Sequence, residues 1–166
     1  MKLIRIFSFL LIPLLTACAA SSSAPTFSQI DFAPTKEDKA IFYIFREYAE
    51  PTAWKATIYI DGNEIVSLPQ QGFTWIYLKP GKHTVTSRWS SMAGVPTVEF
   101  SSEFLANSKF FYEIVGTAKA TGATAGINGP IMSFSTTAQI NTPEEKIAIE
   151  KLSRCCRYIT PETNEI

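Results

Sequence analysis

Few side chains in this sequence can do covalent, redox or metal chemistry. There are three cysteines (Cys18, Cys155 and Cys156) and one histidine, His83. A cysteine thiolate can be acylated, oxidised to a disulfide or bind a metal, and a histidine can move protons near neutral pH. A structural metal site needs about four such ligands at short spacings, which these positions do not provide. The sequence therefore predicts no metal and no cofactor.

Cys18 follows a short apolar run. Lys2 and Arg5 give a basic start, and residues 6–15 are mostly apolar. This run is shorter than the roughly 20 residues that a membrane-spanning helix needs. A basic start, an apolar run and small residues are typical of a secretory signal, here residues 1–17. Ala17-Cys18-Ala19 also fits ordinary signal cleavage, so two kinds of cleavage remain open.

The segment Leu15-Thr16-Ala17-Cys18 resembles the bacterial lipobox. The resemblance implies a diacylglyceryl thioether on Cys18, cleavage before it, and acylation of the new amino terminus, for example with palmitate. Two or more acyl chains anchor a protein stably. Residue 19 is Ala rather than Asp, which for a Gram-negative source implies the outer membrane, facing the periplasm. We therefore expect a lipoprotein bound to a membrane through Cys18.

Cys155 and Cys156 are adjacent in the segment "LSRCCRY". A disulfide between neighbours is one alternative, although it requires a distorted peptide between them. The other is that one cysteine packs as a small apolar residue while the second is exposed and pairs between molecules in an oxidising compartment.

His83 and Asp61 are polar residues beside predicted turns. His83 follows Pro80-Gly81 and is expected to bond to backbone or cap the turn, because no catalytic partner lies near it in sequence. Asp61-Gly62 is typical of a hairpin turn, and the spacing of a calcium-binding loop is absent. No serine-hydrolase, zinc-protease, phosphate-loop or dinucleotide motif is present, so no catalytic residues are predicted.

The remaining chain reads as one domain with one terminal helix. Residues 18–38 are expected to be a lipidated cysteine and a flexible linker, in which Phe27, Ile30 and Phe32 pin the end to the domain. Alternating and β-branched segments in 39–141 predict about seven or eight short strands. Thr142-Pro143-Glu144-Glu145 is a capping-box pattern that predicts a helix over about 142–154.

These elements predict a mainly β fold: a small antiparallel β-sandwich with one C-terminal α-helix. The domain is expected over 39–158, followed by a tail at 159–166. The tract "KATGATAGINGP" (119–130) is rich in glycine and alanine, and is expected to be a loop that is either a partner-binding segment or disordered.

One predicted strand carries an aromatic stripe. Phe73, Trp75 and Tyr77 alternate with Thr74, Ile76 and Leu78, so the three aromatic side chains share one face. Aromatic residues in strands usually pack in the core, but a stripe of this kind can also stack on a ligand. The three residues are therefore candidate ligand-binding residues.

The strand "KAIFYIFRE" followed by "ATIYIDGNEIVSL" and "GFTWIYLKPGKHTV" resembles the lipoprotein domain known as domain of unknown function 2846. The segment also resembles the PEGA-type surface domain, on Tyr59-Ile60-Asp61-Gly62 and Pro80-Gly81-x-His83. The resemblance covers residues 39–115 and implies a small β-sandwich on a lipoprotein. It implies no reaction.

Charge excludes one class of partner. Without the signal, 13 basic and 15 acidic residues remain, a net charge of −2, which does not suit nucleic acid. The sequence favours a non-enzymatic, membrane-anchored envelope lipoprotein that serves as a structural or protein-interaction module, with an envelope protein or glycan as partner. The alternative is a module that binds a glycan, lipid or small hydrophobe. A third hypothesis is that the protein is a hydrolase without a recognisable motif.

Overall fold

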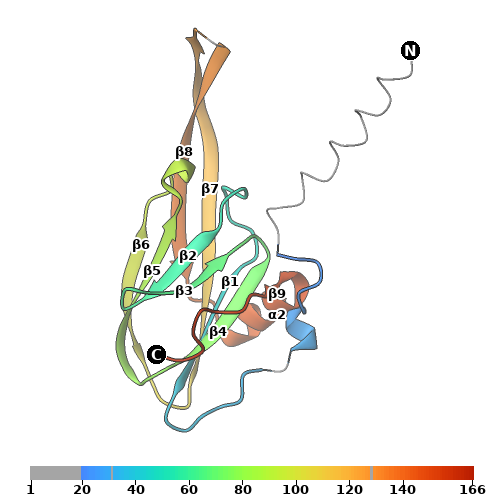
Figure 1. Cartoon of the computed structure of the whole chain (residues 1–166), viewed down its shortest axis with the longest axis vertical. Coiled ribbons are helices and arrows are strands. Elements are labelled where there is room, and N and C mark those ends of the chain that lie inside the picture. Colours follow the sequence, from blue (N-terminus) through green and yellow to red (C-terminus); the bar gives the residue numbers. More distant parts are fainter. Residues whose placement is uncertain (1–19, 31, 128) are drawn as a thin grey trace, which may run out of the picture.

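The computed structural model describes residues 20–30, 32–127 and 129–166, and places them in two packed sheets with one helix on the outside (Figure 1). Cys18 and the predicted signal lie outside the described residues. The predicted fold class, a mainly β sandwich with a C-terminal helix, is confirmed. None of the described helices combines the length and apolar character needed to span a membrane.

The first sheet has the strand order β8-β7-β1-β4-β9, and the second has the order β3-β2-β5-β6. The strands of the first sheet are β1 (Ala40–Arg46), β4 (Gly72–Leu78), β7 (Lys109–Gly126), β8 (Gly129–Asn141) and β9 (Arg157–Tyr158). Those of the second are β2 (Ala56–Ile60), β3 (Asn63–Leu68), β5 (Gly81–Trp89) and β6 (Val98–Phe104). Two pairs, β1 with β7 and β4 with β9, are parallel, which the sequence analysis did not anticipate.

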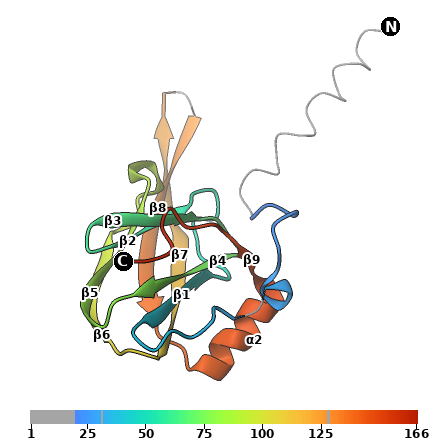
Figure 2. The ribbon, with the colours of Figure 1, turned by 60° about the horizontal axis from the view of Figure 1, so that its bottom comes forward.

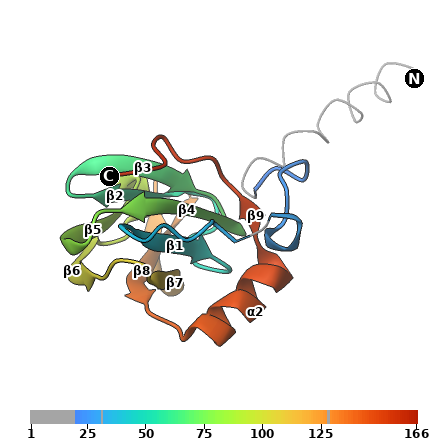
Figure 3. The same ribbon diagram turned by 90° about the horizontal axis from the view of Figure 1, so that it is seen from below.

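Strands β1 and β4 are covered on both faces. One face of the first sheet packs on the second sheet through residues such as Phe42, Ile44 and Ile76. The opposite face packs on helix α2 (Glu145–Cys155) and on the 3-10 helix η2 (Phe27–Gln29), as seen from below in Figure 3. Strand β1, which lies within the segment "KAIFYIFRE", is therefore buried along its whole length.

Helix α2 begins later than its sequence suggested. Its N-cap is Glu144, which makes no side-chain capping bond, so the predicted capping box at Thr142 is wrong. The helix buries Ala148 and Leu152, while Ile147 stays exposed. The helix contacts β7 and η2, and burial of Ala148 and Leu152 rather than a cap holds it in place (Figure 2).

The segment before β1 is fastened to the domain, unlike the flexible linker expected over 18–38. Ala20 N–H donates to Gln70 O at 3.0 Å, and Phe27 N–H donates to Cys156 O at 3.0 Å. Phe27 is buried and packs edge-on against Phe73, with ring centroids 5.3 Å apart. The expected pinning by Phe27 is therefore present, and the attachment extends back to Ala20.

Tyr43 gives this attachment a pH dependence. Its hydroxyl accepts a hydrogen bond from Ala33 N–H at 2.9 Å, and burial raises the pKa of Tyr43 to about 12. Between pH 10 and 12 the unfolded chain loses this phenolic proton and the folded chain keeps it, so Tyr43 lowers the free energy of unfolding by about 1.4 kcal/mol per pH unit. We expect Tyr43→Phe to flatten this alkaline slope in urea-unfolding measurements at pH 9 to 12. Equal slopes in the two proteins would contradict it.

Candidate functional site

The most distinctive surface of the molecule is a hairpin that leaves the sandwich. Strands β7 and β8 pair from Glu113 with Asn141 up to Gly126 with Gly129. Strand β7 pairs with β1 only at residues 109–113, so the upper hairpin has no neighbouring strand and projects beyond both sheets (Figure 1). We call residues 118–136 the arm. The prediction of a loop at 119–130 is wrong, because both sides of this tract are strand.

The arm carries almost no charge. Lys119 is its one charged residue, and residues 120–141 contain none. Several large apolar side chains on it are exposed: Ile127, Ile131, Met132 and Phe134. Exposed strands in soluble proteins are usually protected by charged side chains, so a projecting ribbon with a single charged residue is unusual and suggests a contact surface.

A β-bulge gives the arm two different faces. The register shifts between Ala120 and Gly122, which leaves Thr121 as the extra residue. Because directly opposed residues share a face and neighbours alternate, one face is mainly apolar and the other is mainly polar. The apolar face comprises Ala118, Ala120, Ala123, Ala125, Pro130, Met132, Phe134 and Thr136, and the polar face includes Lys119, Gly122, Thr124, Ile131, Ser133 and Ser135.

An apolar groove of about 370 Å³ lies where the apolar face meets the body. Its lining residues come from the 47–55 loop, from the 3-10 helix η3 (Ser91–Ala93) and from the arm. They are Pro51, Trp54, Met92, Ala93, Ala118, Phe134 and Thr136. The volume lies at the lower end of the range of small-molecule sites.

Arg46 organises the loop that forms one wall of this groove. The Arg46 side chain is fully buried at the end of β1, and its two terminal nitrogens donate to four backbone carbonyls. The acceptors are Ala49, Pro51, Trp54 and Leu68. The guanidinium also stacks 4.4 Å from the ring centroid of Trp89, and burial lowers the pKa of Arg46 to about 10.

Glu50 holds the base of the arm to the same loop. Its backbone N–H donates to Gly116 O at 3.1 Å, and its carboxylate accepts from Ala118 N–H at 2.7 Å. Gly116 permits this approach, because a Cβ there would lie 2.5 Å from Glu50 O. Glu50 therefore occupies the free edge of β7 as far as residue 118, and among the described residues no backbone–backbone hydrogen bond uses that edge beyond it.

The predicted aromatic stripe lies elsewhere, on the face beneath α2. Phe73 and Tyr77 are 1% and 7% exposed, and Trp75 is half-buried. Tyr77 donates to Pro34 O at 2.8 Å, and the Trp75 and Tyr77 ring centroids are 5.4 Å apart. Phe73 packs on Phe27 of the N-terminal segment, and Phe73 and Trp75 both contact Tyr158, so the three side chains do not form an open platform. Their role in ligand binding remains a prediction.

His83 and Asp61 meet, although they are far apart in sequence. His83 Nδ1 lies 2.6 Å from Asp61 Oδ2, and Nε2 lies 2.8 Å from Lys79 O. Burial opposes ionisation of Asp61, but the bonds from Thr84 N–H and His83 outweigh it and hold the pKa of Asp61 below its usual value. Both ring nitrogens face an acceptor, so the imidazole links the turn at Asp61 with the turn at Lys79.

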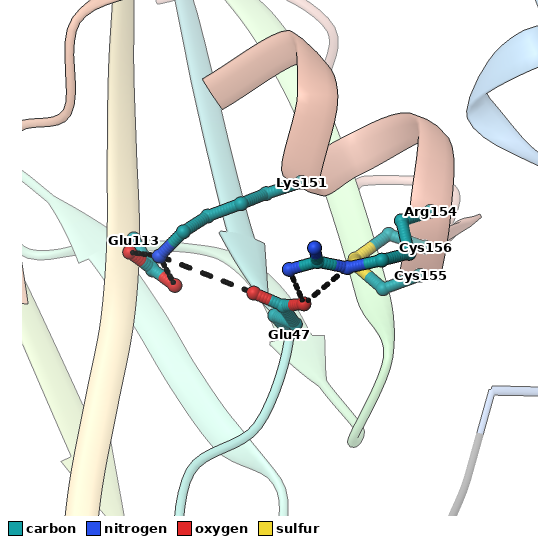
Figure 4. Close-up of polar contacts among 6 residues, drawn as sticks. All are labelled: Glu47, Glu113, Lys151, Arg154, Cys155 and Cys156. Atoms are coloured by element: carbon teal, nitrogen blue, oxygen red, sulfur yellow. Dashed lines mark hydrogen bonds and ion pairs between the residues drawn. A yellow bond between two sulfur atoms is a disulfide. The ribbon is translucent and has the colours of Figure 1, made fainter. Parts of the chain in front are cut away.

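Cys155 and Cys156 form a disulfide at the end of α2, which decides between the two alternatives left open by the sequence (Figure 4). Lys151 and Arg154, on the same helix, form ion pairs with side chains in and next to the sheet. Lys151 Nζ lies 2.8 and 2.7 Å from the carboxylate oxygens of Glu113, and Arg154 Nη2 lies 2.6 Å from Glu47 Oε1. These contacts hold α2 on the sheet.

Within the described part of the chain, no group of three or more His, Cys, Asp or Glu side chains is placed to hold a metal. No protein-family model matches the chain, and no curated protein matches it. Sequence reasoning named residues 119–130 as a loop that is either partner-binding or disordered, but it missed their strand conformation, the groove and Arg46. The uncharged tract after Lys119 was the one signal that pointed to them.

Proposed function

We propose that this protein is a non-enzymatic lipoprotein of the cell envelope, anchored to a membrane through Cys18, whose arm contacts another envelope component. The observation that carries the proposal is the arm: a ribbon with a single charged residue, one apolar face and open edges. A two-stranded ribbon is marginally stable alone in water, so a contact that covers it would stabilise it. The proposed location is the outer membrane, facing the periplasm.

The hydrogen bond at Ala20 supports an anchor that holds the folded domain close to the membrane. Ala20 is bonded to Gln70 in the body, and only Ala19 separates it from Cys18. Two residues span at most about 7 Å. An acylated Cys18 would therefore hold the sandwich directly at the membrane surface, where the arm meets other envelope components at high local concentration.

The test is site-specific photo-crosslinking in intact cells. A photoreactive residue in place of Met132, on the apolar face of the arm, is expected to give a defined adduct. The same residue in place of Lys82, which is exposed on β5, is the control and is expected to give none. Cys18→Ser should also move the protein from the membrane fraction to the soluble fraction. Equal labelling at both positions, or none at Met132, would contradict the proposed role of the arm.

The groove favours one alternative function, the binding of a small hydrophobe or lipid. Its lining is almost entirely apolar, and Trp54 lies in its wall. A saturable change in tryptophan fluorescence on titration with fatty acids, absent in Trp54→Phe, would favour this alternative over a protein contact.

A further inference from the structure

We propose that the partner of the arm is a second copy of this chain, joined by antiparallel pairing of the two β8 strands about a twofold axis at Ser135. This inference rests on the proposed function, since it names the partner of the same arm. Strand β8 is the edge of its sheet, and no backbone–backbone hydrogen bond among the described residues uses its outer side, while the Thr136 hydroxyl donates to Gly94 O and β6 lies close to part of the strand. An open, uncharged edge is a template for strand addition.

The midpoint of β8 determines the register. The strand covers Gly129–Asn141, so full antiparallel overlap of two copies centres on Ser135. Each residue before Ser135 then opposes, in the second copy, the residue that lies equally far after Ser135. Even-numbered residues therefore oppose even-numbered ones, so the apolar face of one arm continues the apolar face of the other.

On the apolar side, this register sets Met132 and Phe134 opposite smaller side chains, and Pro130 opposite Ile140. Met132 opposes Ala138 of the second copy, and Phe134 opposes Thr136 of the second copy. These positions all lie on the same side of β8. The pairing therefore avoids steric overlap between two large residues and covers part of the exposed apolar surface of each arm.

On the polar side, hydroxyl residues meet. Ser135 opposes Ser135 of the second copy, and Ser133 opposes Thr137 of the second copy. Cross-strand hydroxyl pairs stabilise antiparallel sheets, and one is already present within the chain, where Thr117 and Thr137 hydroxyls lie 2.8 Å apart. No charged residue occurs in 129–141, so no like charges oppose each other across the axis.

The size of the contact suits a membrane-bound dimer. Thirteen paired residues extend over about 45 Å, and with side chains on both faces the strip is about 10 Å thick. That is roughly 450 Å² for each copy, or about 900 Å² in total, close to the roughly 1,000 Å² expected of a specific interface. Anchoring both copies on one surface raises their effective concentration. A lipid interior suits the arm less well, because hydrocarbon cannot satisfy the open backbone groups along its edges.

Disulfide trapping in the full-length protein tests the pairing. Ser135→Cys lies on the twofold axis, so mild oxidation of isolated membranes is expected to give a covalent dimer. Lys119→Cys is the matched control, because Lys119 is the partner of Ser135 on β7, on the same face and one strand further from the axis. We expect at least tenfold more dimer from Ser135→Cys than from Lys119→Cys, with Cys155 and Cys156 already paired.

Each outcome supports or overturns the inference. A dimer specific to Ser135→Cys that is lost on adding Thr137→Lys supports it. Equal trapping at both positions, or no trapping, overturns it. If trapping fails while the photoreactive residue at Met132 captures a different envelope protein or a lipid, the partner is not a second copy, and only a protein adduct leaves the proposed function standing. If Met132 captures nothing, the proposed function fails as well.

Discussion

Arg46→Met is expected to lower the free energy of unfolding by about 3–5 kcal/mol. The guanidinium of Arg46 is the donor for four backbone carbonyls in and beside the 47–55 loop. Methionine fills similar space but donates nothing, and each buried acceptor left without a donor costs about 1–3 kcal/mol. None of the ion pairs among the described residues includes Arg46, so its buried charge has no carboxylate partner. Removing an unpaired buried charge is favourable and recovers part of this cost.

Urea unfolding at pH 7 measures this effect, with Arg88→Met as the matched control. Arg88 is exposed on β5, where it stacks on the Tyr59 ring at 4.9 Å, and its replacement should change stability by no more than about 0.5 kcal/mol. The loss of stability in Arg46→Lys is expected to lie between those of the two methionine variants. One ammonium group cannot reach all the carbonyls that the two terminal guanidinium nitrogens bind. Similar losses in Arg46→Met and Arg88→Met would show that the loop is held by other contacts.

Local signals in the sequence were sufficient for the turns and for the order of most elements. Asp61-Gly62 joins β2 and β3 with positive φ at both residues, as the hairpin signal predicts. Pro80-Gly81 also lies at a turn, but β4 and β5 belong to different sheets, so this turn crosses the sandwich. Turn chemistry determines where the chain reverses, while the choice of sheet depends on contacts between distant segments.

The site depends on such distant contacts, which explains why sequence reasoning assigned the arm as a loop and did not find the role of Arg46. Glycine and alanine have weak strand propensity, so the tract after Lys119 resembles a loop. Its strand conformation comes from pairing with β8, and the bulge at Thr121 keeps its alanines on one face. Arg46 ends an apolar strand and resembles an ordinary solvated residue. Its acceptors lie 3 to 22 positions further along the chain and were not foreseeable from its neighbours.

Helix α2 is held over the first sheet by a contact of the same non-local kind. The Glu113 side chain on β7 is 6% exposed, and both its oxygens accept hydrogen bonds from Lys151 Nζ. Glu47 Oε2 lies 3.9 Å from the same nitrogen and also contacts Arg154 through its other oxygen (Figure 4). A carboxylate so well buried depends on its cation, because the interior offers little solvation for an unpaired charge.

Lys151→Met is therefore expected to lower the free energy of unfolding by about 2–3 kcal/mol. This is somewhat less than the cost of breaking a fully buried ion pair, because the Lys151 side chain is 29% exposed. Adding Glu113→Gln removes the stranded charge, so the double variant should recover about half of the loss. Lys146→Met, on an exposed position of the same helix, controls for the change of residue type and should cost no more than about 0.5 kcal/mol. Urea unfolding of the wild type, Lys151→Met, Glu113→Gln and the double variant gives the coupling energy between Lys151 and Glu113. If Lys151→Met and Lys146→Met prove equivalent, the packing of Ala148 and Leu152 holds the helix without help from the ion pair.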